Sequence, residues 1–225
     1  MIISNKNFLI LKNKFCIINS GFANLYSIKN AFVNLGIDAE IINSVQDLKK
    51  YSIAILPGVG SFKQVKDNLD KNDFSSGIKD FIAEGKPFLG ICLGMQLLFS
   101  KGFEGIEPSE GLGIFEGEVV LLPKEKISRI PHMGWNLLKF TDNSSNIFNN
   151  FKNNNSFVYF VHSYYCKAEQ NSDLIAEVFI EKDFCVPAIV KKNNVFGMQF
   201  HPERSGDLGL NILKAFAQES CKICT

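Results

Sequence analysis

The strongest candidate for chemistry in this sequence is Cys92, in the segment Gly90-Ile-Cys92-Leu-Gly94. This segment is the cysteine version of the G-x-S-x-G elbow, where a nucleophile stands on a tight strand-to-helix turn. Glycines flank it because such a turn leaves no room for Cβ atoms. A helix that begins directly after Cys92 points its positive dipole end at the sulfur and favours the thiolate. On these five residues alone, a buried structural cysteine is an equally good interpretation.

A thiolate nucleophile needs a proton shuttle, and His201-Pro-Glu203 offers an imidazole with a carboxylate beside it. The segment follows an expected strand over 195–200, and residues i and i+2 of an extended chain project to the same side. We therefore expect His201 to exchange a proton with Cys92 while Glu203 orients the ring. A surface histidine beside a glutamate is the alternative, and the elbow elsewhere in the same chain makes it the weaker one.

A third element is Pro57-Gly-Val-Gly60, which follows another expected strand. Glycines on both sides of Val59 allow the peptide to reorient and to present N–H groups to a tetrahedral oxyanion. The candidate donors are the backbone N–H groups of Val59, Gly60 and Leu93. The segment is a poor phosphate loop because it lacks the Lys-Ser/Thr of a P-loop. Taken alone, the segment is better interpreted as an ordinary strand-to-helix turn.

The elements that must position these residues alternate between short apolar strands and helical periodicity. In the first half the pattern predicts strands at 15–19, 39–42, 53–56 and 87–91, and helices at 24–35, 74–84 and from Cys92 to about Phe99. In the second half it predicts strands at 119–122, 157–161, 175–180, 187–190 and 195–200, and a closing helix at 208–217. This order indicates one α/β domain, with a mostly parallel central sheet flanked by helices and additional antiparallel strands in the second half.

Composition excludes several classes of protein. The 225 residues are 46% hydrophobic and 21% charged, which excludes disorder, and a net charge of +1 predicts neither a nucleic-acid nor a membrane partner. The longest apolar run, 157–161, is far shorter than the roughly 20 residues that cross a bilayer. No secretory signal is visible, so we expect a soluble cytoplasmic protein with reduced cysteines. The pair Cys221 and Cys224 lacks a second ligand pair, and we expect no metal and no cofactor.

Taken together, the motifs resemble those of the class I, or triad, glutamine amidotransferases. The resemblance is carried by Pro87-Phe-Leu-Gly-Ile-Cys92-Leu-Gly-Met-Gln96 and by His201-Pro-Glu203. It narrows to the glutaminase subunits of imidazole glycerol phosphate synthases, from histidine biosynthesis, through Leu56-Pro-Gly-Val-Gly60, Pro131-His-Met-Gly-Trp-Asn136, Phe160-Val-His-Ser-Tyr164 and Gln199-Phe-His-Pro-Glu-Arg-Ser205. It runs in order from about residue 15 to 216 and implies a flavodoxin-like fold.

The resemblance implies that Cys92, His201 and Glu203 hydrolyse L-glutamine to glutamate and ammonia. It also implies that Gln96 and Glu104 hold the α-carboxylate and α-amino ends of the substrate, although residues 100–103 depart from the more acidic stretch usual there. Ammonia would pass to a (β/α)8-barrel cyclase in a heterodimer, which forms imidazole glycerol phosphate and an aminoimidazole carboxamide ribotide. The implied interface residues are His132, Trp135, Tyr159 and Arg204. The plainer alternatives are that Trp135 is buried in the core and that Arg204 is a solvated surface residue.

Two departures from the family pattern leave alternatives open. Asn19-Ser20-Gly21 replaces the usual acidic residue before a glycine, and residues 1–14 form an extension ahead of a single domain at 15–220. A paralogue that supplies ammonia to another synthase, such as one for surface-sugar amination, would share the chemistry. A stand-alone cysteine γ-glutamyl hydrolase would need no partner and no interface loop at 131–136. The intact triad disfavours an inactive binding module.

Overall fold

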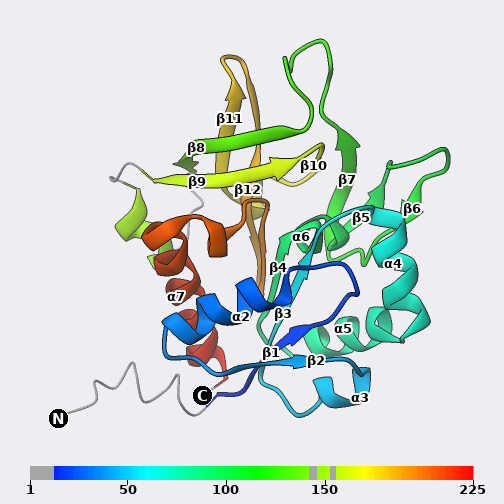
Figure 1. Cartoon of the computed structure of the whole chain (residues 1–225), viewed down its shortest axis with the longest axis vertical. Coiled ribbons are helices and arrows are strands. Elements are labelled where there is room, and N and C mark those ends of the chain that lie inside the picture. The colour runs from blue at the N-terminus through cyan, green and yellow to red at the C-terminus, as the bar shows by residue number, and fades with distance from the viewer. Residues whose placement is uncertain (1–12, 142–145, 153–155, 225) are drawn as a thin grey trace.

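The computed structural model describes residues 13–141, 146–152 and 156–224. Most of the expected extension, and the Asn-rich loop tip at 153–155, lie outside these ranges. In the described residues a nine-stranded sheet has the order β2-β1-β3-β4-β13-β12-β11-β8-β9, and a four-stranded sheet has the order β10-β7-β5-β6 (Figure 1). The α/β fold class is as the sequence predicts.

The first five strands of the large sheet run parallel to one another. They are β2 (Ala39–Ile42), β1 (Phe15–Ile18), β3 (Ile53–Gly58), β4 (Phe88–Cys92) and β13 (Val195–Met198). Nearly every residue in them is buried, as a sheet covered on both faces requires. The elbow and the His201 segment both follow central strands, at the carboxyl edge where α/β folds bind ligands.

The other four strands of the large sheet are antiparallel to their neighbours. They are β12 (Phe184–Lys192), β11 (Leu174–Glu181), β8 (His132–Phe140) and β9 (Phe157–His162). The small sheet comprises β10 (Tyr164–Ala168), β7 (Phe115–Leu121), β5 (Phe99–Gly102) and β6 (Ser109–Glu110). The two sheets meet at Ser163, because β9 and β10 follow each other directly there.

Helices cover both faces of the parallel strands. One face packs against α2 (Leu25–Asn34) and α7 (Gly206–Ile223), and the other against α4 (Phe62–Lys71) and α5 (Phe74–Ala83). Alternation along β1 explains this, since Phe15 and Ile17 join the first core and Cys16 and Ile18 the second. The shorter helices are α3 (Val45–Leu48), α6 (Leu93–Leu97), η1 (Asn146–Phe151), η2 (Asn171–Asp173) and η3 (Pro202–Arg204).

Four expectations about local structure are wrong. The helix after Cys92 ends at Leu97, because the chain turns into β5, whose Phe99 ring stacks on Phe115. The expected loop at 131–136 belongs to β8 from His132 onward, where it pairs with β9. The strand expected over 195–200 ends at Met198, and α7 continues beyond 217 to Ile223.

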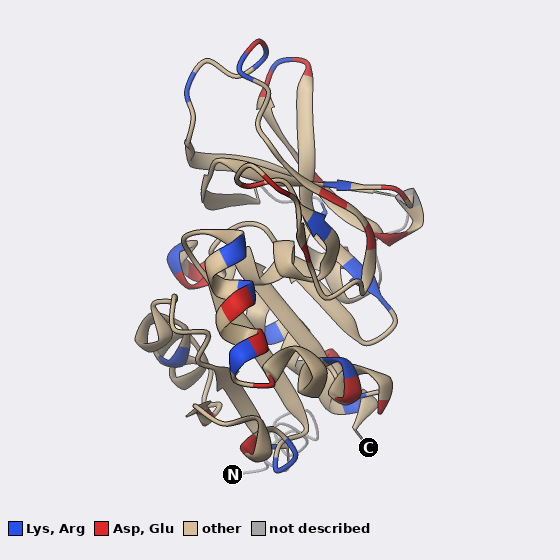
Figure 2. Ribbon diagram, turned by 90° about the vertical axis from the view of Figure 1, so that its right-hand side faces the viewer, with Lys and Arg blue, Asp and Glu red and all other residues tan. Residues whose placement is uncertain are grey.

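Charged side chains do not gather by sign. Lys and Arg alternate with Asp and Glu along the helices in the view of Figure 2, and on α4 Lys63 and Lys66 pair with Asp67 and Asp70 one turn later. Within the described ranges, no helix combines the length and the apolar character needed to span a bilayer.

Candidate active site

Cys92 occupies a strained elbow between β4 and α6. Its backbone has φ 54° and ψ −112°, a region that non-glycine residues rarely adopt, and α6 begins at the next residue. The neighbouring glycines are required by close approach. A Cβ on Gly94 would overlap the carbonyl oxygen of Leu56, and one on Gly90 would lie 2.5 Å from the carbonyl oxygen of Gly94. The elbow therefore presses α6 against β3 and presents Cys92 at the carboxyl edge of the sheet.

His201 and Glu203 form a buried pair beside this elbow. Nδ1 of His201 lies 2.8 Å from Oε1 of Glu203, and their side chains are 7% and 4% exposed. The pair is not held by an extended strand as expected: His201 precedes η3, whose 3-10 turn brings Glu203 back to the ring. The Nε2 atom of His201 is buried and has no ordinary hydrogen-bond partner in the described part of the chain.

The electrostatics of His201 favour a charged ring. Burial by itself lowers its pKa, but interactions with Cys92 on one side and Glu203 on the other raise the pKa to about 10. The imidazolium is therefore the stable form at neutral pH, placed between a sulfur and a carboxylate. This arrangement can donate a proton to a leaving group at the sulfur and later recover one from water.

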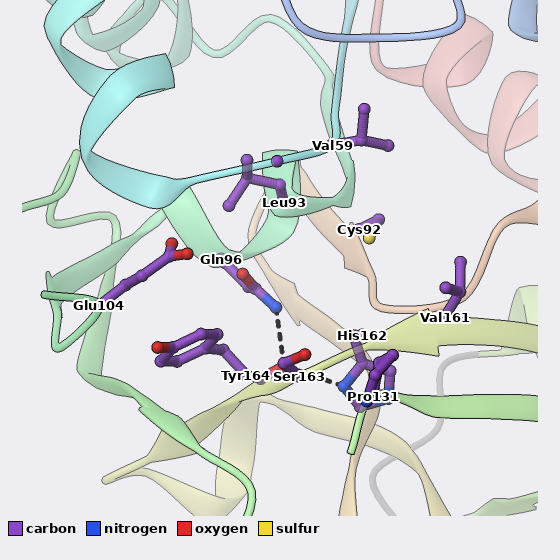
Figure 3. Close-up of a pocket in the computed structure, with 11 residues that line it drawn as sticks. Val59, Cys92, Leu93, Gln96, Glu104, Pro131, Val161, His162, Ser163 and Tyr164 are labelled. Carbon is purple, nitrogen blue, oxygen red and sulfur yellow. Dashed lines mark hydrogen bonds between the residues drawn. The ribbon is translucent and has the colours of Figure 1, made fainter.

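A cavity of about 280 Å³ opens in front of the sulfur (Figure 3). Its lining comes from five parts of the chain: Val59 and Gly60; Cys92, Leu93 and Gln96; Glu104; Pro131; and Val161, His162, Ser163 and Tyr164. Cys92, Gln96 and Glu104 line one cavity although β4, α6 and the segment after β5 supply them. His201 and Glu203 are not among the lining residues, although His201 interacts with Cys92, which is.

The two expected substrate-binding residues offer acceptors to this cavity. Nε2 of Gln96 donates to the carbonyl oxygen of Tyr164 at 2.9 Å and to Oε1 of Gln199 at 3.0 Å, which leaves Oε1 of Gln96 uncommitted. Glu104 accepts the N–H of Phe62, the first residue of α4, through Oε2 at 2.5 Å. The carboxylate therefore caps α4 and keeps its other oxygen for a ligand.

The expected oxyanion donors differ in their availability. The N–H of Val59 donates to the carbonyl oxygen of Phe22 at 2.8 Å, so it points away from any oxyanion at Cys92. Leu93, the first residue of α6, has an N–H that no carbonyl of its own helix can accept. Gly60 lines the cavity with φ 95°. In this conformation the site lacks the Val59 donor.

Sequence reasoning missed several residues around the sulfur. Gln199 is fully buried, and its Nε2 lies 3.8 Å from the Cys92 sulfur. His162 lines the cavity, and burial lowers its pKa to about 4. Both lie in segments that carried the family resemblance, Gln199-Phe-His201 and Phe160-Val-His162-Ser-Tyr164, so the motifs themselves were the available signal.

The four expected interface residues lie on β8, β9 and η3, but only Trp135, Tyr159 and Arg204 contact one another; His132 is on the opposite face of β8, where its ring packs against Phe160 and His162. Trp135 is 54% exposed, which excludes a core anchor, and its ring meets that of its cross-strand neighbour Tyr159 at 5.9 Å. The guanidinium of Arg204 lies over the ring of Tyr159, 4.4 Å from its centroid. His132 is half-buried, and its Nε2 is 2.9 Å from Oδ1 of Asn136.

The described residues contain no group of three or more His, Cys, Asp or Glu side chains arranged to hold a metal ion. The chemistry available to the site is that of a cysteine nucleophile, an imidazolium, a carboxylate and backbone N–H groups.

Comparisons with known proteins agree on one family. The model for "Glutamine amidotransferase class-I" matches residues 16–219. The chain is 46% identical over 204 residues to "Imidazole glycerol phosphate synthase subunit HisH" of Caldanaerobacter subterraneus subsp. tengcongensis, covering 90% of this chain and 96% of that protein. It is 43% identical to the protein of that name from Lactococcus lactis, over 92% and 98%. The "Structure of PurLQS from Thermotoga maritima" matches with a TM-score of 0.68 at 20% identity, over 91% and 97% of the two chains, which shows a shared fold.

Proposed function

We propose, since the chain belongs to the class-I glutamine amidotransferase family, that it is the glutaminase subunit of an imidazole glycerol phosphate synthase. It hydrolyses L-glutamine to glutamate and ammonia for histidine biosynthesis in the cytoplasm. The observation that carries the proposal is Cys92, which lines a cavity and interacts with the His201–Glu203 pair. We further propose that residues 15–220 form the catalytic domain and residues 1–14 an extension.

Substrate binding follows from the acceptors of the cavity. Oε1 of Gln96 and the second oxygen of Glu104 both accept hydrogen bonds, so they suit the α-ammonium group of glutamine. Two acceptors cannot hold the α-carboxylate, contrary to the division of roles expected from the family. The carboxylate needs donors, and the segment Ser163-Tyr164 of the cavity lining has backbone N–H and hydroxyl groups.

The first chemical step is attack of the Cys92 thiolate on the side-chain carbonyl carbon of glutamine. The C–N bond then breaks, and the imidazolium of His201 gives its proton to the leaving nitrogen, which departs as ammonia. A γ-glutamyl thioester and a neutral His201 remain. Glu203 keeps the ring oriented through Nδ1.

In the second step, His201 takes a proton from water, the resulting hydroxide adds to the thioester carbonyl and the C–S bond breaks. The products are a γ-carboxyl group and a thiolate beside an imidazolium, which is the starting state. Both steps pass through an oxyanion, and the N–H groups of Leu93, Gly60 and a reoriented Val59 are its candidate donors.

The partner is a cyclase, for which we propose a (β/α)8 barrel that turns the ammonia into imidazole glycerol phosphate and an aminoimidazole carboxamide ribotide. Three cross-strand pairs place apolar side chains on one side of β8 and β9: Met133 with Val161, Trp135 with Tyr159, and Leu137 with Phe157. An exposed apolar face of this kind marks a protein interface. Arg204 over Tyr159 adds a cation for a partner carboxylate.

One backbone hydrogen bond connects this apolar face to His201, the catalytic base. The carbonyl oxygen of Tyr159 accepts the N–H of His201 at 3.0 Å, and the N–H of Tyr159 donates to Oγ of Ser205 at 2.9 Å. Docking on Tyr159 therefore acts on the segment that carries the imidazole.

The deciding experiment measures synthesis by the chain together with a cyclase subunit. Cys92→Ala should abolish product formation from glutamine and preserve it from added ammonium salt, because the cyclase needs only ammonia. Glutamine-dependent synthesis by Cys92→Ala would contradict the mechanism. Failure of the wild-type complex to make product from either nitrogen source would contradict the assignment of the partner.

A further inference from the structure

Gln199 makes the hydrogen bond to the candidate nucleophile. It follows β13, is fully buried, and donates its backbone N–H to the carbonyl oxygen of Ala188 at 3.0 Å. Its side-chain Nε2 lies 3.8 Å from the sulfur of Cys92. Across the described residues, no other hydrogen bond reaches this sulfur with ordinary geometry. The catalytic steps above leave Gln199 without a role.

The direction of this hydrogen bond is fixed by a chain of side-chain amides (Figure 3 shows its first link). The carbonyl oxygen of Tyr164 can only accept, so the amide nitrogen of Gln96 must face it, at 2.9 Å. The same nitrogen lies 3.0 Å from Gln199, which must therefore present its oxygen. Nε2 of Gln199 is then the atom left to face Cys92. An amide orientation that is otherwise ambiguous is determined by one backbone carbonyl.

This series of amide hydrogen bonds therefore directs an N–H at the sulfur of Cys92, which must be an anion to attack the substrate. A donor stabilises the thiolate over the thiol, and hydrogen bonds to ionised groups are the stronger kind. Unlike His201, an amide does not titrate, so the donor persists after the imidazolium has given its proton to ammonia. The other end of the chain is Oε1 of Gln96, a candidate contact for the substrate.

We propose that Gln199 is a positioning residue for the nucleophile, holding the Cys92 sulfur as the thiolate through Nε2 and linking it through Gln96 to the substrate cavity. The kinetic part of its test rests on the proposed glutaminase function, whereas the alkylation part does not.

The primary test is the rate at which iodoacetamide alkylates Cys92, followed by mass spectrometry of the peptide that carries it. Gln199→Met keeps the length of the side chain and removes the donor. We expect the rate at pH 7 to fall about tenfold, the usual worth of a hydrogen bond to a charged acceptor, and to recover at pH 10. The exposed Cys185 in the same sample is the internal control and should react at an unchanged rate.

The pH dependence is attributable to Gln199 because the other titratable groups around the sulfur are the same in both proteins. They are His201 and Glu203 beside η3, His162 on β9, Cys166 on β10 and Glu104 across the cavity. Gln199→Glu, which has the same shape but an anionic acceptor, should lower the rate at pH 7 further. This second variant also decides the question if Gln199→Met does not fold.

Wild-type alkylation profiles for both folded variants would overturn the proposal. In the complex with a cyclase, Gln199→Met should lower kcat for glutamine about tenfold and leave KM within about threefold. Synthesis from ammonium salt should be unchanged. An altered alkylation profile in a chain whose wild type lacks glutaminase activity would support the role of Gln199 while refuting the proposed function.

Discussion

At the scale of single residues, the site depends on how neighbours set the charge of two histidines. His201 is raised to a pKa of about 10 by Cys92 and Glu203 against the effect of burial, whereas burial lowers the pKa of His162 to about 4. One ring is therefore charged and the other neutral at physiological pH, within the same small region. Each pKa shift has a measurable consequence, for the titration of His201 and for the acid stability conferred by His162.

The first prediction concerns His201. Removing the sulfur by Cys92→Ala takes away one of the two partners that stabilise the imidazolium, so the pKa of His201 should fall by about one unit or more. The measurement is an NMR titration of the ring signals, which is tractable because the chain has only three histidines. Glu203→Gln should act in the same direction. An unchanged pKa of His201 in both variants would show that neither Cys92 nor Glu203 stabilises the imidazolium.

The second prediction concerns His162 and stability. An unfolded histidine titrates near pH 6.5. Between pH 6.5 and 4, position 162 is therefore protonated in the unfolded chain but neutral in the native protein. The stabilisation is complete above pH 6.5 and disappears as pH falls toward 4, by about 3 kcal/mol for a shift of this size. His162→Asn, which retains a donor for the carbonyl oxygen of Tyr164, should remove most of that acid sensitivity.

Urea unfolding at pH 7.5 and at pH 4.5 measures this difference. His132→Asn is the matched control, because His132 is only half-buried and burial lowers its pKa less. Equal acid sensitivity in wild type and His162→Asn would contradict the prediction.

At the scale of elements, the conformation of the segment after β3 governs the reaction. The Val59 N–H donates to Phe22 rather than pointing toward Cys92, and the loss of one oxyanion donor typically costs about 10²–10³ in rate. The structure therefore has the features of a resting state. A partner that favours a conformation in which the Gly58–Val59 peptide turns its N–H toward Cys92 would raise turnover without changing the triad.

The third prediction follows from Gly60, whose φ of 95° suits glycine. Gly60→Ala should strain the backbone at this positive φ and restrict movement of the segment that carries the N–H groups of Val59 and Gly60. It should lower partner-stimulated glutaminase turnover about tenfold or more, with KM for glutamine nearly unchanged. Gly113→Ala is the matched control: Gly113 also has a positive φ and open space for a Cβ, but lies outside the cavity lining.

Steady-state kinetics of the chain alone, with partner, and with partner plus acceptor ligand test this prediction. Equal turnover of the wild type in all three conditions would eliminate gating. A rise in KM that accounts for the whole effect of Gly60→Ala would instead assign the glycine to substrate binding.

At the scale of the whole molecule, the antiparallel strands extend the sheet beyond the catalytic edge and carry an apolar face that is exposed in the part of the chain that the structure describes. The fourth prediction is that Trp135→Ala weakens cyclase binding at least about thirtyfold, as truncation of a central interface Trp commonly does. Ile223→Ala, an exposed apolar change at the far end of α7, should leave binding unchanged. Titration calorimetry measures both, and equal affinities would place the interface elsewhere.

The fifth prediction concerns the extension. A chain that begins at Asn13 should retain the partner-stimulated rate within about twofold. Hydrogen bonding to the sheet is seen from Lys14 onward: its carbonyl oxygen accepts the N–H groups of Ser52 and Ile53 at 2.9 and 3.2 Å. The preceding residues alternate Lys and Asn with short apolar pieces and lie ahead of β1, the first strand of the structure. A folded truncated chain with a much lower rate would assign the extension a functional role.

The sequence by itself determined the fold class, the parallel strands and the identity of Cys92, His201 and Glu203 as candidates. Those inferences depend on local causes: side-chain alternation, glycine at a crowded turn, and residue types that can exchange protons. The crowding at Gly90 comes from Gly94, within the same five residues, whereas the crowding at Gly94 comes from Leu56 on β3, which only the fold brings near. The extent of β8 could not be recognised from the sequence, since its exposed apolar residues are stabilised by pairing with β9, about 25 residues away.

Only the tertiary structure decided how the candidates meet. The carbonyl of Phe22 holds the Val59 N–H, Tyr164 orients Gln96, and Gln96 orients Gln199 toward Cys92. Each link joins residues from separate strands and loops, and a hydrogen bond depends on distances and angles that no sequence pattern encodes. The same holds for the charge of His201, because its pKa reflects burial and two partners that only folding brings together.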